Sequence, residues 1–393
     1  MSWGERHSRR RIALRLFVLA CVAWSLLGAA SAHADRQLAE QDFLRATTTF
    51  GAMQRAYYLP YHNLYRGWPE AYSYLWPFSQ ALSATVALAG VQPAYRVDMA
   101  ALLNGLAHYW KANKSPPSYG SYVTGPLGPG GTTFYDDDEW VGLQLVRIYR
   151  LTGSRLALKQ AQMIFRLVLY GWDRNAKHPC PGGVWWTQDP SVGTRNTVSN
   201  APAAELGLYL YELTGNHSYL VWAQRFYAWV LTCLRDPEAG LYEDHVSLDG
   251  TLDSTFWTYN QGTMLGTETL LYRITRDPTY LRRAWQDASA SLQHFDQASL
   301  QAQPSFFISI FLDNLRLLEV TSPGTAYSNA IQEYADWAWS ARRDPATGLF
   351  SFNDGPGSAL LEQASMIQIY AFLSWGPRWY LPPPHAHRLR RVG

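Results

Sequence analysis

The chain has little charge and few cysteines for its length of 393 residues. Charged residues make up 16 % of it, against roughly 25 % in a typical soluble domain, and there are only three cysteines. So few cysteines exclude a disulfide-dense fold, and glycine has no repeat that would indicate a collagen-like chain. A formal net charge of +2 argues against a basic nucleic-acid-binding surface, so we expect no nucleic-acid partner.

Aromatic residues are present in excess instead. The 17 Trp, 25 Tyr and 15 Phe contribute to a hydrophobic fraction of 47 %, which can bury a large core and excludes a disordered chain. Most of these rings are expected to pack inside the protein. The remainder are candidates for a ligand-binding surface.

The first 34 residues have the order of a secretory signal peptide. Arginines precede an apolar run over residues 16–30 that is short for a membrane span of ~20 residues, and small residues around Ala32 and Ala34 fit a cleavage site. An uncleaved membrane anchor is the alternative. Cleavage would remove five Arg and one Glu from 33 basic and 31 acidic side chains, leaving 28 and 30. We expect a secreted or cell-envelope protein without a membrane span after cleavage, ending in a flexible basic tail over residues 381–393.

Two of the three cysteines, Cys180 and Cys233, lie outside this leader. In an oxidising compartment they could form a disulfide, or they could remain as two separate buried thiols. Their contexts differ too much to suggest a zinc site. No cofactor motif or metal-ligand cluster is visible elsewhere, so we expect neither a cofactor nor a metal.

Four segments share a pattern of an aromatic or aliphatic residue, a Thr three positions later and an Ala nine positions after the Thr. Each copy predicts two helices joined by a short turn. In the second copy, for example, residues 203–213 have apolar residues at helical spacing, Thr214-Gly215-Asn216 interrupts them, and residues 219–234 resume the period. Glycine at the turn, as at Gly153 and Gly215, can adopt the left-handed conformation that ends a helix. The copies are Tyr149/Thr152/Ala161, Tyr211/Thr214/Ala223, Tyr272/Thr275/Ala284 and Leu318/Thr321/Ala330.

Helical hairpins cannot bury their apolar faces alone, so they must stack into a solenoid or close into a ring. About six units of about 50–60 residues fit into residues 35–380. We therefore predict an all-α fold, an (α/α)6 toroid of helical hairpins in one domain, and a monomer. An open α-solenoid that serves as a binding scaffold is the alternative.

Residues 135–140 have the sequence Tyr-Asp-Asp-Asp-Glu-Trp, with four consecutive carboxylates in a chain that has few charges. They follow a loop rich in Gly and Pro over residues 115–134 and precede a helical pattern. One explanation is a helix N-terminus, where acidic side chains accept hydrogen bonds from free N–H groups and favour the positive end of the helix dipole. A calcium loop would alternate its ligands with other residues and fits poorly.

The functional explanation of this acidic run is a catalytic carboxylate pair. Neighbouring carboxylates repel each other, so the pKa of one rises and that group stays protonated near neutral pH while the other remains ionised. One acid and one base side by side are what glycoside cleavage requires. Carboxyls ~5–5.5 Å apart give retention of anomeric configuration, and those ~6.5–9.5 Å apart give inversion. Adjacent residues, with Cα atoms ~3.8 Å apart, fit the shorter class better.

Aromatic and amide side chains elsewhere suit a sugar ligand. Trp185 and Trp186 follow two glycines in a second loop, and paired indoles can stack on the apolar faces of pyranose rings. Core packing is the alternative for any single Trp, and helix capping is the more ordinary role for hydroxyl and amide groups at a helix start. The hydroxyl and amide candidates lie in Ser199-Asn200 and in Thr258-Tyr259-Asn260-Gln261-Gly262.

In this order, the motifs resemble glycoside hydrolase family 76, the bacterial endo-α-1,6-mannanases and their fungal cell-wall relatives. The likeness runs from about residue 60 to residue 290. It is carried by Tyr135-Asp136-Asp137 before Trp140, Gly182-Gly183-Val184-Trp185-Trp186, Ser199-Asn200, the Leu-Thr-Gly repeat with Tyr219-Leu220 and Trp222-Ala223, and Thr258-Tyr259-Asn260-Gln261-Gly262.

The resemblance implies an (α/α)6 fold and retaining hydrolysis at α-1,6-linked mannose. It implies that Asp136 is the nucleophile and Asp137 the general acid/base. Asp138 stands where the family often has Asn, which leaves open which of the three carboxylates takes each role. The residues expected to bind substrate in a groove are Tyr135, Trp185, Trp186, Asn200, Tyr259, Asn260 and Gln261.

We therefore expect a secreted endo-glycoside hydrolase that cleaves α-1,6-mannosidic linkages in a polysaccharide or oligosaccharide partner. One alternative is a cell-wall transglycosylase, in which a sugar instead of water captures the covalent intermediate. A second is a non-catalytic glycan-binding toroid. An epimerase or lyase would usually need His or Tyr bases, and the sequence has no His near the acidic run.

Overall fold

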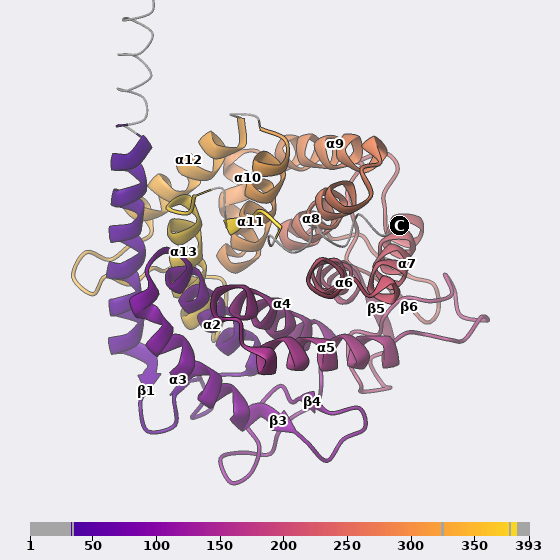
Figure 1. The fold of residues 1–393 in the computed structure, drawn as a ribbon, viewed down its shortest axis with the longest axis horizontal. Helices are drawn as coiled ribbons and strands as arrows, with labels where there is room; N and C mark the ends of the chain where they lie inside the picture. Colours follow the sequence, from indigo (N-terminus) through magenta and orange to yellow (C-terminus); the bar gives the residue numbers. More distant parts are fainter. Residues whose placement is uncertain (1–32, 34, 324–325, 377–378, 383–393) are drawn as a thin grey trace, which may run out of the picture.

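Helices alternate along the chain between an inner and an outer position around a common centre (Figure 1). The computed structural model describes residue 33 and residues 35–323, 326–376 and 379–382. The predicted signal peptide over residues 1–34 therefore lies almost wholly outside the described residues, as does most of the predicted tail over 381–393. None of the helices in the described part of the chain is long and apolar enough to cross a membrane.

In the described part of the chain, six inner helices form a closed ring, because each packs against the next and the last packs against the first. In ring order they are α2 (Leu75–Val91), α4 (Tyr135–Thr152), α6 (Ala201–Thr214), α8 (Thr258–Thr275), α11 (Ser305–Thr321) and α13 (Ala359–Leu373). Their burial is nearly all-round, as expected of helices enclosed by others.

The outer helices lie against this ring, and each returns the chain to the end at which the next inner helix begins (Figure 1). They are a helix over residues 35–57, α3 (Arg96–Leu106), α5 (Arg155–Tyr170), α7 (His217–Cys233), α9 (Pro278–His294) and α12 (Ala326–Ala341), with a short α10 (Gln297–Ala302). The pattern of six inner and six outer helices confirms the predicted (α/α)6 toroid.

The threonine repeat marks the turns between inner and outer helices. The Thr214 hydroxyl donates to the carbonyl of Leu210 at 2.7 Å and accepts from the N–H of Asn216 at 3.2 Å. Thr152 and Thr275 make the same pair of bonds in their hairpins. The residue after each Thr has a left-handed backbone, with φ of 73°, 72° and 66° at Gly153, Gly215 and Arg276. One hydroxyl thus ends one helix and orients the start of the next.

The opposite end of the ring carries long loops and short antiparallel strands. β1 (Tyr58–Leu59) pairs with β2 (Leu64–Tyr65), and β3 (Trp110–Lys111) pairs with β4 (Ser118–Tyr119). β5 (Thr194–Asn196), β6 (His245–Ser247) and β7 (Leu252–Asp253) form a three-stranded sheet. The sequence distance from Thr275 to Thr321 is shorter than the distances between the earlier threonines of the repeat, because only residues 295–304 connect α9 to α11.

Three amides fasten these loops to the inner helices. Gln261 in α8 accepts from the backbone N–H of Tyr242 at 2.9 Å and donates to its carbonyl at 2.8 Å. Gln363 in α13 binds Phe350 in the same way, and Asn200 at the start of α6 binds Val184. Each amide satisfies both backbone groups of one loop residue, as buried polar groups require.

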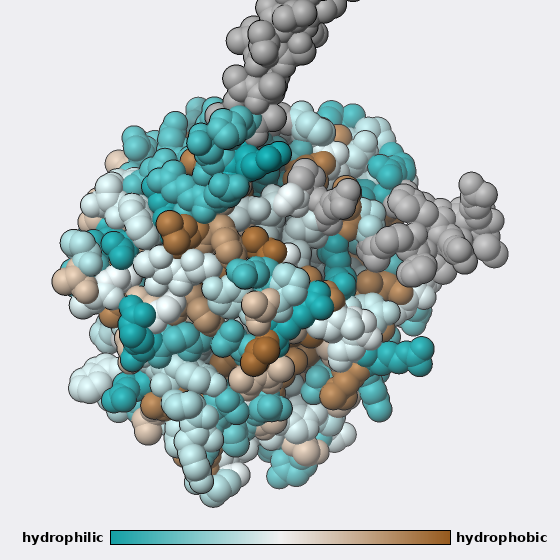
Figure 2. Space-filling model, turned by 60° about the vertical axis from the view of Figure 1, so that its left-hand side comes forward, coloured by the Kyte–Doolittle hydropathy of each residue, from teal (hydrophilic) through white to brown (hydrophobic). Residues whose placement is uncertain are grey.

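A disulfide joins Cys180 to Cys233, so the first of the two alternatives left open by the sequence is the one found. Cys233 is the last residue of α7, and Cys180 lies in the loop over residues 171–193. On the face drawn in Figure 2, hydrophobic residues are scattered among hydrophilic ones.

Candidate active site

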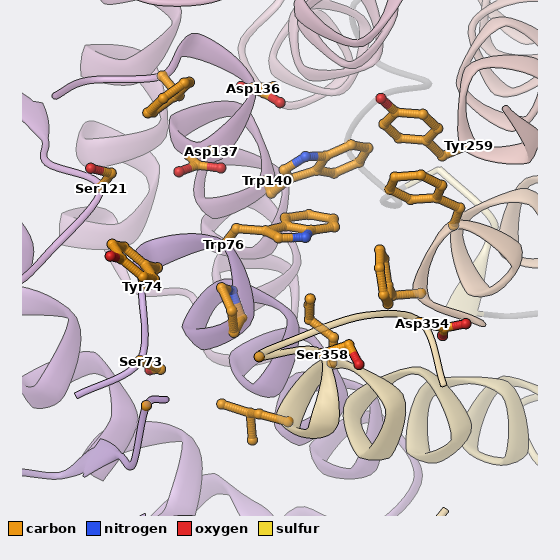
Figure 3. Close-up of a pocket in the computed structure, with 18 of the residues that line it drawn as sticks. Ser73, Tyr74, Trp76, Ser121, Asp136, Asp137, Trp140, Tyr259, Asp354 and Ser358 are labelled. Carbon is orange, nitrogen blue, oxygen red and sulfur yellow. The ribbon is translucent and has the colours of Figure 1, made fainter. Parts of the chain in front are cut away.

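A cavity of about 1020 Å³ lies where the inner helices begin (Figure 3). We call it the main cavity. First turns of α2, α4, α8, α11 and α13 contribute to its walls, together with the loops of that end. Residues central to it are Tyr74, Trp76, Asp136, Asp137, Trp140, Trp186, Asp244, Tyr259, Phe306, Phe307 and Asp354.

The four consecutive carboxylates lie at the N-terminal end of α4, three of them in its first turn, so successive side chains point in different directions. Asp136 and Asp137 line the main cavity. Asp138 is fully buried behind them and accepts a 3.0 Å hydrogen bond from the backbone N–H of Tyr119. Glu139 is also fully buried. The helix geometry therefore separates two cavity-facing carboxylates from two enclosed ones.

The two cavity-facing carboxylates differ in their hydrogen bonding. Asp136 accepts a 3.3 Å bond from the indole Nε1–H of Trp186. Burial raises the pKa of Asp136 to about 7, the Trp186 bond opposes this rise, and the negative charge of Asp244 adds to it. Burial also raises the pKa of Asp137 well above its usual range, and the neighbouring charges of Asp136 and Asp138 raise it further. Asp136 thus has a hydrogen bond that favours its ionised form, whereas burial and both neighbouring charges disfavour the ionised form of Asp137.

Trp186 is held in place by the backbone around it. Its N–H donates to the carbonyl of Thr194, and its own carbonyl accepts from the N–H of Tyr135, the first residue of α4. Phe134 packs edge-on against its ring at 5.0 Å between centroids. The indole N–H is therefore directed at Asp136 by a segment that is tied to the start of the same helix.

A third carboxylate, Asp244, lies on the main cavity just before β6. It accepts from the side-chain amide of Asn260 at 3.3 Å and pairs with Nδ1 of His245 at 2.9 Å. The Asp244 hydrogen bond raises the pKa of His245. Sequence reasoning missed Asp244, although a repeated Arg-Asp-Pro-x-x-Gly-Leu motif at residues 235–241 and 343–349 precedes both it and the cavity residue Asp354.

Asp244, His245 and Asp253 could supply metal ligands, because one ligand atom from each lies within 4.8 Å of the others. The His245 Nδ1 atom is already engaged by Asp244 at 2.9 Å, and the pairing of β6 with β7 places His245 opposite Asp253. The arrangement has an ordinary explanation as a charged pair on a sheet. The expectation of no metal therefore stays a prediction.

Aromatic rings form another part of the wall. Trp76 and Trp140 lie 5.6 Å apart at 47°, and Tyr259 stacks on Phe307 at 3.9 Å and 5°. The Tyr259 hydroxyl points toward Asp136 (Figure 3), and burial together with the charges of Asp244 and Asp136 raises the pKa of Tyr259. Tyr259 therefore stays a neutral phenol that can donate a hydrogen bond near the carboxylates.

Only some of the residues expected to bind substrate reach the main cavity. Trp186 and Tyr259 line it, and Asn260 lies behind Asp244. Asn200 and Gln261 are buried and hold the loop residues Val184 and Tyr242 instead. The two remaining residues, Tyr135 and Trp185, line a different cavity on the other side of the Trp185–Trp186 segment.

Comparison with known proteins identifies relatives of this chain. The model of the family described as glycosyl hydrolase family 76 matches residues 44–348. The mannan endo-1,6-alpha-mannosidase DCW1 of Saccharomyces cerevisiae is 31 % identical over 144 residues, which cover 34 % of this chain and 31 % of that protein. A putative mannan endo-1,6-alpha-mannosidase of Schizosaccharomyces pombe is 25 % identical over 242 residues, which cover 54 % and 53 %. The chain thus spans about a third to a half of the length of these relatives.

Solved structures share the fold. A family 76 glycoside hydrolase from a bovine Bacteroides thetaiotaomicron strain superposes with a TM-score of 0.75 at 26 % identity, covering 85 % of this chain and 77 % of that one. An inactive variant of an α-1,6-mannanase from Salegentibacter, in complex with α-1,6-mannotriose, has a TM-score of 0.68 at 22 % identity, with 84 % and 99 % covered. The second likeness concerns the fold alone.

Proposed function

The chain belongs to glycosyl hydrolase family 76, and on that basis we propose that it is a retaining endo-hydrolase of α-1,6-linked mannan. The observation that carries the proposal is the Asp136–Asp137 pair on the main cavity, where only Asp136 accepts a hydrogen bond from the Trp186 indole and Asp137 is buried between two further carboxylates. Two adjacent carboxyls in different surroundings can divide the nucleophile and acid roles.

In the proposed first step, ionised Asp136 attacks the anomeric carbon while protonated Asp137 donates its proton to the departing glycosidic oxygen. The bond between the anomeric carbon and that oxygen breaks as the bond to the Asp136 carboxylate forms. In the second step, Asp137 takes a proton from water, whose oxygen displaces Asp136 from the sugar. Two displacements at one carbon restore its configuration.

The assignment of roles follows the surroundings of the two carboxyls. Asp136 is assigned as the nucleophile, because the Trp186 indole donates to it and favours its ionised form. Asp137 is assigned as the proton donor, because burial and two neighbouring negative charges raise its pKa well above its usual range and favour its protonated form. Asp138 is occupied by the backbone of Tyr119.

The substrate class is supported by the walls of the main cavity. Aromatic faces such as those of Trp76 and Trp140 suit the apolar faces of pyranose rings, and a few convergent polar groups can bind their hydroxyls. The names of the curated relatives favour mannan with 1,6-linkages. An extracytoplasmic location is supported by the Cys180–Cys233 disulfide, because such bonds persist in oxidising compartments.

Incubation of the purified protein with linear α-1,6-mannan tests the proposal. We expect a ladder of mannose oligosaccharides by mass spectrometry, and NMR of the first products should show the α-anomer before mutarotation. Initial release of the β-anomer would contradict retention. Longer oligosaccharides formed with an added acceptor would instead identify a transglycosylase, and binding without products would identify a glycan-binding toroid.

A further inference from the structure

A second cavity, of about 730 Å³, lies on the outer side of the Trp185–Trp186 segment, and we call it the outer cleft. It opens between the Gly/Pro-rich loop that precedes α4 and the loop that follows α5. Its aromatic lining consists of Tyr135, Tyr170, Trp172 and Trp185. Its polar and charged lining includes Lys114, Arg174, His178, Thr187, Gln188 and Asp189.

The outer cleft and the main cavity share a wall. Trp185 donates its backbone N–H to the carbonyl of Gly171, and Trp186 donates to Thr194. Successive side chains of an extended segment point to opposite sides, so one indole faces each cavity. Tyr135 and Asp136 are divided between the two cavities in the same way at the start of α4. A ligand in the outer cleft would therefore be separated from one in the main cavity by the Trp185–Trp186 segment and the start of α4.

The Trp185 side chain is held in place by the buried side chain of Arg195. Arg195 is fully buried, and its guanidinium lies 5.5 Å from the centre of the Trp185 ring. That guanidinium also donates to the carbonyls of Pro179 and Cys180 and to Asp173, which ties it to the disulfide-bonded loop. An aromatic side chain that is fixed before binding loses little conformational entropy when a ligand stacks on it.

The other groups of the outer cleft fit a neutral, hydroxyl-rich ligand. Tyr170 stands at the rim with 57 % of its surface exposed. The Tyr135 hydroxyl faces Tyr170 and Gln188, and burial raises the pKa of Tyr135 to about 12, so it remains a phenol donor. Lys114 and Arg174 are balanced in part by Asp189, whose pKa is lowered by hydrogen bonds from Ser191. Mixed charge with aromatic faces favours a sugar over an anion.

We propose that the outer cleft is a second saccharide-binding site, which takes a mannopyranose unit of the same glycan whose backbone is cleaved in the main cavity. The inference rests on the proposed function for the identity of the sugar. A glycan chain or branch that crosses the segment over residues 188–194 would contact both sites. Its attachment to the outer cleft would keep the polymer on the enzyme between cleavage events.

The two Trp indoles make the two sites separately measurable. Linear α-1,6-mannotriose, too short to act as a tether, is titrated into the Asp136→Asn protein while NMR follows the indole N–H signals, which are assigned by Trp185→Phe and Trp186→Phe. We expect the Trp185 signal to shift to saturation with its own dissociation constant. Tyr170→Ala should raise that constant about tenfold and leave the constant reported by Trp186 within about twofold. Tyr61→Ala, at a side chain 90 % exposed and outside both cavities, is the matched control and should change neither.

The possible results separate the two proposals. A Trp186 shift without a Trp185 shift, or a Trp185 shift that Tyr170→Ala does not weaken, overturns the second site and leaves the proposed function standing. A Trp185 shift alone supports the second site while it contradicts mannan binding in the main cavity. If neither signal moves, both the second site and the substrate assignment are wrong.

Discussion

The two ends of the toroid are built on different principles. At one end, the turns at Thr152, Thr214 and Thr275 repeat the same two hydroxyl hydrogen bonds, and each Thr is followed by a residue with a left-handed backbone. At the other end, the loops differ in length and carry the carboxylates, the aromatic walls and the disulfide. Repetition is used where the chain only has to reverse, and variation is used where it has to bind.

The two ends also contribute differently to the stability of the fold. The repeated turns satisfy their polar groups and stabilise the helices that they join. The loop end instead keeps carboxyls buried at the cavity, which raises the pKa values of Asp136 and Asp137 and disfavours their charged forms. Substitutions at the cavity carboxylates should therefore change activity and its pH dependence, whereas substitutions at the repeated turns should change only the free energy of unfolding.

The largest effect is expected in the proposed catalytic pair. Asp136→Asn and Asp137→Asn should each lower kcat for mannan about 10³-fold or more, since one removes the proposed nucleophile and the other the proposed proton donor. Asp138→Asn is the matched control within the same run of carboxylates. Its oxygen can still accept from Tyr119, so kcat should stay within about tenfold of the parent protein. An equal loss in all three variants would mean that the pair is assigned wrongly.

The second effect is a gain in stability at the same position. The pKa of Asp136 is about 7 in the folded protein and near 4 when unfolded, so the folded state binds more protons between these values and is destabilised as the pH rises. Asp136→Asn removes this penalty. In urea titrations the variant should match the parent at pH 4 and exceed it by about 4 kcal/mol at pH 8. A constant difference across that range would exclude the explanation.

The third effect concerns the hydrogen bond from Trp186. Trp186→Phe keeps an aromatic ring but removes the N–H that favours ionised Asp136, so the pKa of Asp136 should rise further. The acidic limb of the kcat/KM profile should move upward by about one pH unit. Trp76→Phe, which alters the same cavity without touching this bond, should leave the limb in place. If the acidic limbs of the kcat/KM profiles of Trp186→Phe and the parent coincide, the indole N–H does not influence the pKa of Asp136.

The smallest effect is expected at the repeating end. Thr214→Ala loses the hydroxyl that bonds Leu210 and Asn216, which should lower the free energy of unfolding by about 1 kcal/mol. The value of kcat should not change, because the turn lies at the end remote from the carboxylates. Thr214→Ser, which keeps the hydroxyl, should recover most of the loss. A fall in kcat with Thr214→Ala would contradict the separation of the two ends.

The sequence allowed the repeated parts of the molecule to be predicted because they depend on local chemistry. A Thr followed by Gly, or a run of carboxylates after a Pro-rich loop, indicates its structure within a few residues, and both the hairpins and the cavity-facing Asp136–Asp137 pair could be located in this way. The same was true of the left-handed residues Gly153 and Gly215.

What could not be predicted depends on which loop meets which helix. Asn200 and Gln261 have the amides that a sugar site needs, but the structure uses those amides to hold Val184 and Tyr242. Asp244 reaches Asp136 only because β6 lies next to β5, 49 or more residues away from it in sequence. The opposite directions of Trp185 and Trp186 follow from backbone bonds to Gly171 and Thr194.

The closure of the ring has a consequence for how the protein folds during synthesis. The helix over residues 35–57 lies against the last hairpin, where Arg45 pairs with Asp336 and lies over the rings of Trp339 and Tyr370. In α2, Ser83 donates to Gln368 of α13 at 2.7 Å. The helices that are synthesised first therefore keep part of their contact surface exposed until the helices that are synthesised last have been made. A ribosome that stops before residue 359 would release a chain with an open seam, which is a substrate for chaperones and proteases rather than a smaller version of the fold.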